Sequence, residues 1–231
     1  MKVVGVDGCK GGWIAILWDT EMHTVEPIVY ALLKEIIEAN PDASAIGIDI
    51  PIGLSDTGTR QCDLCARKLL GRPRSSSVFP PPVFEILEAE TYPEAVIASN
   101  KRIGKGISKQ CYAIFPKILE ANQTITPDMQ TRVFEVHPEV SFFVLGKGPM
   151  AHKKSSAEGF VARRSLLEAA MRITIPEKKV VASWAKPAKP DDILDAMVAA
   201  WTAGRVVQQE AIRLPAQSLL DARGVRMEIL A

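Results

Sequence analysis

The stretch "VVGVDGCKGGWIAILWD", Val3–Asp19, constrains the fold of this chain more than any other segment. Two apolar runs rich in β-branched residues, Val3–Val6 and Trp13–Trp18, flank a short glycine-containing turn, which predicts an antiparallel hairpin of buried strands. Asp7 ends the first of these strands. Burial of a carboxylate there costs free energy of solvation unless another group compensates its charge. The opening of the chain therefore predicts a sheet and, at its edge, an acid that needs a partner.

The glycines of this turn do not predict a dinucleotide site. Gly5, Gly8 and Gly11 are evenly spaced, but such a site needs glycines that open a helix facing the pyrophosphate. Here strand residues follow them, and the chain has no G-K-[ST] that would make a phosphate loop. The glycines therefore indicate a hairpin turn that leaves Asp7 uncovered.

The remaining pattern is typical of a mixed α/β domain. The segment Ala45–Ile50 is apolar on both faces, as buried parallel strands are, so we expect it to lie parallel to the first strand. Further strands are expected at Val25–Tyr30 and Arg132–Val136. Helical segments are expected at "ALLKEIIEAN", Cys62–Leu70, Pro82–Glu90, Ile107–Ala121 (ended or kinked by Pro116), Ala157–Met171 and from Pro190 onward.

We expect one domain, residues 1–231, with an insertion at about 51–106 after the fourth strand. Proline clusters, serines and basic residues dominate that stretch, so we expect an elaboration of the sheet without a core of its own. Its Cys62 and Cys65 form a lone C-x-x-C, which is half a zinc site without a convincing second half.

Composition restricts the partners and cellular location that we expect for the protein, but it does not indicate an activity. The formal net charge of +1 argues against a protein that coats nucleic acids, yet it leaves room for a local basic groove. No apolar run is long enough to cross a bilayer and no secretion signal is visible, so we expect a cytoplasmic protein without membrane contact. The sequence leaves the oligomeric state open, a homodimer included.

Acidic residues end or begin several of the buried elements. Asp7 and Asp49 each close an apolar strand, and Asp192 and Asp195 share one face of the last helix, three residues apart. The small residues Ala196, Ala199 and Ala203 continue that face, which would let the helix press closely on the sheet. If these acids converge, their mutual repulsion requires cations, and carboxylates are ligands for Mg²⁺ or Mn²⁺. We therefore predict a divalent metal site at Asp7, Asp49, Asp192 and Asp195; the alternative is a set of unrelated caps and turn acids.

The segment "FEVHPEV" contributes two further candidates. Glu135 would complete the metal site as a catalytic acid, and His137 would move a proton near neutral pH. The alternative is a strand-to-helix turn in which Pro138 and Glu139 start a helix.

Basic residues gather in and after the predicted insertion, with Asp63 as the single acid among the first of them. Such side chains grip phosphate backbones without reading sequence, which predicts nucleic acid as the substrate. The alternative is an ordinary solvated run of charges. The candidate substrate-binding residues are Arg60, Arg67, Arg72, Arg74 and Lys109.

Five motifs in this order resemble the DUF429 family, whose members are described as RNase H-like nucleases inferred from their fold. The motifs are "GVDGCKGGWIAI", "GIDIPIGL", "RQCDLCARKLLGRPRSSSVFPPPV", "FEVHPEVSF" and "DDILDAMVAAWTA". The resemblance implies a five-stranded mixed sheet, its first three strands antiparallel, flanked by helices. A more distant similarity to resolvases of the RuvC type implies metal-ligand roles for Asp7, Asp49, Asp192 and Asp195, although Asp49 stands where those enzymes usually have glutamate.

These observations favour a metal-dependent nuclease that cleaves DNA or RNA. A phosphoryl-transfer or nucleotide-binding protein of the actin and sugar-kinase type is a second hypothesis, but only one copy of its hairpin signature is present. A catalytically silent RNase H-like binding module is the third, and metal binding at the acids discriminates it from the first.

Overall fold

The computed structural model describes residues 1–231 and divides the chain into two compact units. The sheet unit comprises Met1–Asp49, Arg132–Ile212 and Leu230–Ala231, and the insertion unit comprises Ile50–Thr131 and Arg213–Ile229. The inserted segment therefore runs to Thr131, beyond the expected end near residue 106, and a second segment close to the end of the chain joins it. Buried apolar side chains, among them Ile52, Leu70, Phe115 and Ile118, give the insertion unit an interior of its own, contrary to our expectation.

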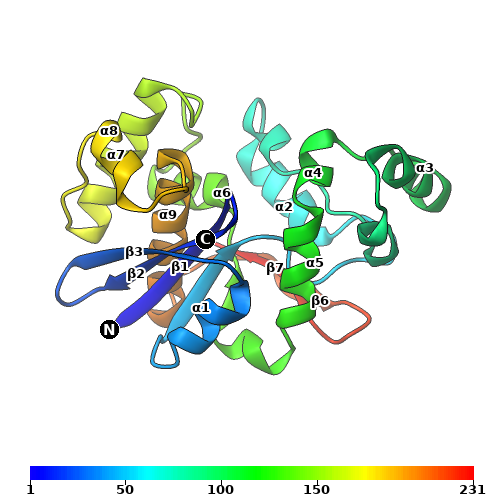
Figure 1. The fold of residues 1–231 in the computed structure, drawn as a ribbon, viewed down its shortest axis with the longest axis horizontal. Helices are drawn as coiled ribbons and strands as arrows, with labels where there is room; N and C mark the ends of the chain where they lie inside the picture. Colours follow the sequence, from blue (N-terminus) through cyan, green and yellow to red (C-terminus); the bar gives the residue numbers. More distant parts are fainter. The chain divides into compact units, whose positions relative to one another are not determined.

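The sheet unit is built on a five-stranded mixed sheet with the order β3-β2-β1-β4-β5 (Figure 1). Its strands are β1 (Lys2–Cys9), β2 (Gly12–Asp19), β3 (Thr24–Tyr30), β4 (Ala45–Asp49) and β5 (Val133–Glu135). Strands β1, β2 and β3 pair antiparallel, while β4 runs parallel to β1 and β5 runs parallel to β4. The predicted hairpin, the parallel fourth strand and the mixed sheet flanked by helices are confirmed.

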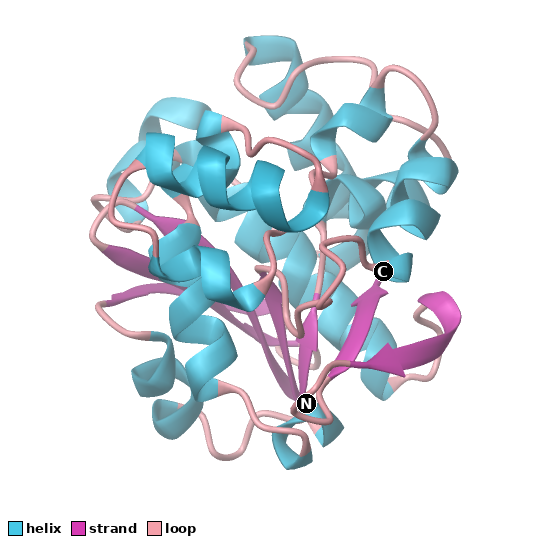
Figure 2. Cartoon of the chain, turned by 90° about the vertical axis from the view of Figure 1, so that its right-hand side faces the viewer, coloured by secondary structure: helices cyan, strands magenta, loops and turns pink.

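Helices flank this sheet (Figure 2). They are α1 (Leu33–Ala39), α6 (Pro138–Leu145), α7 (Ala157–Met171), α8 (Lys178–Trp184) and α9 (Pro190–Val207). Helix α9 lies along β1, β2 and β4, and α6, α7 and α8 pack against α9, while α1 packs against β2 and β3. Pro190 occupies the first turn of α9, where its missing N–H costs nothing. Because α9 is covered on both sides, all its residues from Ile193 to Gly204 are buried.

Two glycines let the backbone of α9 approach the sheet. A Cβ atom placed on Gly5 of β1 would lie 2.0 Å from the Ala196 carbonyl oxygen and 2.1 Å from the Ala200 amide nitrogen. A Cβ on Gly47 of β4 would lie 2.8 Å from the Ala199 carbonyl oxygen. Alanines of α9 therefore meet glycines of the sheet, and this close contact fixes the position of the helix along the strands.

The insertion unit has three short 3₁₀ helices, at Arg74–Ser77, Phe84–Glu88 and Asp128–Thr131, and the second of them stands where a longer helix was expected at Pro82–Glu90. The unit also holds four α-helices and a two-stranded ribbon. They are α2 (Gln61–Leu70), α3 (Tyr92–Ile103), α4 (Lys109–Ala113), α5 (Phe115–Thr124), β6 (Arg213–Leu220) and β7 (Arg226–Leu230), whose last residue belongs to the sheet unit. The helical run predicted at Ile107–Ala121 is divided at Ile114, and Pro116 lies in the first turn of the second helix. No helix in either unit is long and apolar enough to span a bilayer.

Two α-helices and two strands were not predicted: α3, α8, β6 and β7. Helix α3 buries only Ala95 and Ser99, so no large apolar side chain marks its buried face. Strand β6 has no buried residue and therefore lacks the alternation that marks a half-buried strand. Strand β7 is buried almost throughout but has only five residues.

Candidate metal site

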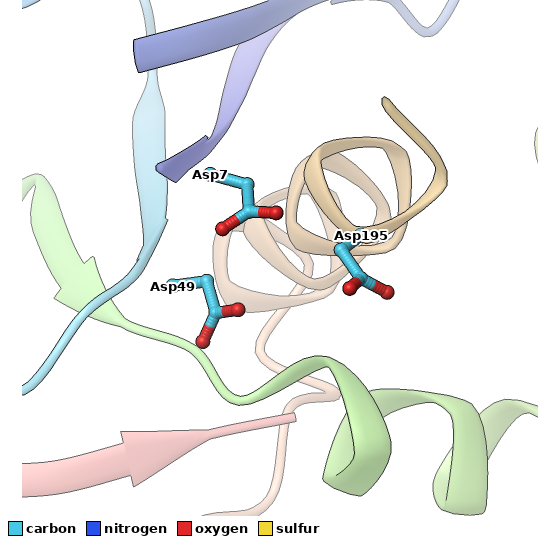
Figure 3. Close-up of side chains that lie close together, drawn as sticks. All are labelled: Asp7, Asp49 and Asp195. Carbon is cyan, nitrogen blue, oxygen red and sulfur yellow. The ribbon is translucent and has the colours of Figure 1, made fainter. Parts of the chain in front are cut away.

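Three carboxylates from three separate elements meet at one edge of the five-stranded sheet (Figure 3). Asp7 comes from β1, Asp49 from β4 and Asp195 from α9, and one oxygen of each lies within 4.8 Å of the other two. We call these three residues the acid triad. The predicted convergence of strand-end acids with the last helix is thus present in the structure for three of the four aspartates.

The local sequence explains why these side chains share one place. Asp7 and Asp49 are direct neighbours in the parallel register of β1 and β4. Each follows a glycine by two residues, and because side chains alternate across a strand, each points to the face on which that glycine meets α9. Asp195 immediately precedes Ala196, whose carbonyl contacts Gly5. The Gly-x-Asp spacing in both strands therefore directs two carboxylates toward the beginning of α9.

Burial and mutual repulsion disfavour the charged form of the triad. Burial raises the pKa of Asp7 well above its usual range, and the charges of Asp49 and Asp195 raise it further. Burial, followed by the charge of Asp195, raises the pKa of Asp49 to about 8. Burial also raises the pKa of Asp195. These groups gain stability from any cation that enters the site.

Lys154 supplies the one cationic side chain that contacts the triad. Its Nζ donates to Asp195 Oδ2 at 2.6 Å. Burial lowers the pKa of Lys154, but the charges of Asp195, Asp7 and Asp49 raise it by more, so the ammonium stays charged. Sequence reasoning missed this residue because it lies in the irregular segment between α6 and α7, where no periodicity predicts the direction of a side chain.

The other two predicted acids lie next to the triad. Glu135 is buried at the end of β5, and its charge helps to raise the pKa of Asp49. Asp192 lies in the first turn of α9, where its Oδ2 accepts the Lys189 backbone N–H at 2.9 Å. Burial raises the pKa of Asp192, and this hydrogen bond opposes the shift. Asp192 is therefore a helix cap in this structure, and a role for it or for Glu135 in metal binding stays a prediction.

The segment after β5 is a strand-to-helix turn, which was the alternative to a catalytic role for it. His137 is the N-cap residue of α6, and Pro138 occupies the first turn of that helix. Glu139 forms an ion pair with Arg163 of α7, whose guanidinium also lies over the Phe142 ring. The Arg163 charge lowers the pKa of Asp195, and that of Glu139 raises it.

One predicted substrate-binding residue needs correction. The side chain of Arg60 is only 1% exposed, and its guanidinium donates to both carboxylate oxygens of Asp63, at 2.6 and 3.0 Å. It also donates to the carbonyl oxygens of Ile52 and Gly53. Arg60 therefore holds the insertion unit together, and we no longer count it among the residues that contact phosphate.

The remaining basic candidates also belong to the insertion unit. Arg67 donates to the Val78 carbonyl at 2.5 Å, and Lys109 lies over the Tyr92 ring at 5.9 Å from its centroid. Arg72 is exposed and Arg74 is partly buried. Their part in substrate binding stays a prediction.

The sheet unit also has a cavity of about 490 Å³ that lies away from the triad. It is lined by Lys2, Val4 and other residues around the beginning of β1, whereas Asp7 lies near the opposite end of that strand. The cavity therefore does not include the converging acids.

The acid triad fits a small divalent cation in the chemistry and spacing of its donors. Mg²⁺ and Mn²⁺ prefer carboxylate oxygens, and two oxygens on opposite sides of Mg²⁺ stand about 4.2 Å apart. At least two of the three oxygen pairs would have to be adjacent on the ion, about 3 Å apart, and the triad oxygens lie within 4.8 Å of one another, so the side chains would close by up to about 2 Å around it.

The raised pKa of Asp49 predicts how stability depends on pH without metal. Because its pKa is about 8 in the folded chain and near the usual 3.8 in the unfolded chain, the folded state binds the extra proton between these values. Stability is therefore expected to fall as pH rises from about 4 to about 8. Asp49→Asn should match the wild-type protein near pH 4 and exceed it by several kcal/mol at pH 8, because a pKa shift of this size changes the free energy of unfolding by that much. Urea unfolding in EDTA at both pH values measures this; an equal difference at both would contradict it.

The comparisons with known proteins bear on the family of the chain. The model of one family, described as "Protein of unknown function (DUF429)", matches residues 5–219. No curated protein and no solved structure matches at a significant level. The matched segment includes the acid triad, Lys154 and almost all of the insertion unit. The chain therefore belongs to the DUF429 family.

Proposed function

We propose that this protein is a metal-dependent nuclease that hydrolyses phosphodiester bonds in DNA or RNA. The observation that carries the proposal is the acid triad, in which three buried or partly buried carboxylates converge although their charges repel. Only one side-chain cation, Lys154, offsets them within hydrogen-bond distance. Such an arrangement costs folding stability and is expected where a bound cation, and the chemistry that it supports, requires it.

In this proposal Asp7, Asp49 and Asp195 hold Mg²⁺ or Mn²⁺. Bound divalent ions would supply charge stabilisation to the phosphate that is cleaved and lower the pKa of a water that attacks it. Asp7 is the neighbour of Asp49 in the parallel register of β1 and β4, and each of the three residues offers a carboxylate oxygen that would hold the ion. Glu135 and Asp192 are the nearest further acids and are candidates for completing the site.

Basic residues of the chain would bind the nucleic acid away from the bond that is cleaved. Arg67, Arg72, Arg74 and Lys109 are the candidates for contacts to backbone phosphates, and such contacts give affinity without sequence preference. This part of the proposal predicts that binding weakens steeply as salt concentration rises.

The test is cleavage by purified protein under controlled metal conditions. Single-stranded and double-stranded DNA, RNA and a branched DNA junction are incubated with Mn²⁺, with Mg²⁺ or with EDTA. We expect cleavage of at least one substrate with metal and none with EDTA, and the Asp7→Asn protein purified in the same way should be inactive. Protein that neither binds Mn²⁺ nor cleaves any of these substrates would favour a catalytically silent binding module, and saturable ATP binding would favour phosphoryl transfer.

A further inference from the structure

The positively charged side chain of Lys154 lies against the acid triad. Its Nζ lies 2.6 Å from Asp195 Oδ2, and its charge also acts on Asp7 and Asp49. Asp195 lies in a buried turn of α9, whereas Lys154 belongs to residues 146–156, which form neither helix nor strand. The acid is therefore fixed by packing, and the lysine is the partner that is able to move.

A divalent ion at the triad and the ammonium of Lys154 compete for the same negative charge. The ammonium occupies one oxygen of Asp195, and an ion bound to the triad would lie within a few ångströms of it, where like charges repel strongly in a partly buried site. The side chain of Lys154 is 47% exposed, so an outward path to solvent is open to it. No comparable path exists for Asp195, whose side chain is 3% exposed.

We propose that the Lys154 ammonium is the counter-ion of the metal-free triad and that a divalent cation displaces it from Asp195. This inference rests on the metal site of the proposed function and adds a means by which the chain itself sets the affinity of that site. With the ammonium in place only the fraction of molecules in which it has moved away binds metal, so the apparent dissociation constant is raised by the inverse of that fraction.

The first test measures Mn²⁺ binding by calorimetry. Lys154→Gln removes the charge and is expected to bind Mn²⁺ about tenfold more tightly than wild type, as it would if about a tenth of wild-type molecules are free to bind. Lys154→Arg keeps the charge and should bind Mn²⁺ much as wild type does. Lys153→Gln is the matched control, because it removes an exposed lysine charge one residue away and should leave the affinity unchanged.

The second test needs no substitution and follows the lysine directly. The wild-type protein is labelled with an amine-reactive reagent in EDTA and in saturating Mn²⁺, and labelling of each lysine is quantified by mass spectrometry. Lys154 should label slowly in EDTA, while it is paired with Asp195, and several-fold faster in Mn²⁺. Lys153 should label at the same rate in both.

The outcomes separate this inference from the proposed function. Equal Mn²⁺ affinity in wild type and Lys154→Gln, or weaker binding by the variant, would overturn the inference and leave a metal site in place. A labelling rate of Lys154 that does not change when Mn²⁺ binds would also overturn it. If neither protein binds Mn²⁺, both the inference and the metal site of the proposed function fail.

Discussion

Asp7→Asn is expected to lower metal-dependent cleavage by at least ~100-fold while the protein stays folded. Loss of a residue that only orients a metal ligand commonly costs 10- to 100-fold, so loss of a ligand itself should cost more. The fold should persist because asparagine keeps the shape of the side chain. The substitution also removes a carboxyl group whose charged form is disfavoured, since burial and the charges of two neighbouring acids raise its pKa. The initial rate of cleavage in Mn²⁺, together with a thermal melt in EDTA, measures both parts.

Asp42→Asn is the matched control for this variant. Asp42 belongs to the same unit, but its side chain is 59% exposed and pairs only with the exposed Lys2. The control should cleave at the wild-type rate. Cleavage that persists in the Asp7→Asn protein would show that the activity does not depend on the acid triad.

Gly5→Ala is expected to destabilise the sheet unit strongly, although it adds only one methyl group. The new Cβ would lie 2.0 Å from one backbone atom of α9 and 2.1 Å from another, and neither atom can turn away as a side chain can. Relief requires α9 to move off β1, and overpacking of this kind costs about 3 kcal/mol. For a chain of this size we expect the melting temperature to fall by about 6–12 °C.

The same shift should reach the acid triad, because Asp195 precedes the alanine that contacts Gly5. Mn²⁺ affinity should therefore fall in Gly5→Ala under conditions where the variant is still folded. Gly148→Ala is the control: a Cβ at Gly148 meets nothing within 4 Å, and this residue is also in the sheet unit. A Gly5→Ala protein as stable as this control would contradict the close contact between β1 and α9.

The strands of the sheet and the places of its acids along the chain follow from local sequence patterns. Alternation and apolar runs are local properties, so β1, β2 and β4 could be predicted from their own residues, as could α7. The aspartates at two strand ends and in one helix were sufficient to predict convergence, because the topology of a mixed sheet brings those ends together. The Gly-x-Asp spacing, visible in "GVD" and "GID", was a further signal for which face the acids share.

Which charged side chains meet depends on packing between distant segments and could not be predicted from local patterns. Lys154 pairs with an acid 41 residues away, and Arg60 turns into the interior of its unit, although both stand in polar stretches typical of exposed residues. The inserted residues join a late segment, Arg213–Ile229, to form a second compact unit. The physical reason is the same in each case: periodicity reports the burial of apolar faces, whereas the partner of a charge depends on packing between segments far apart in the chain.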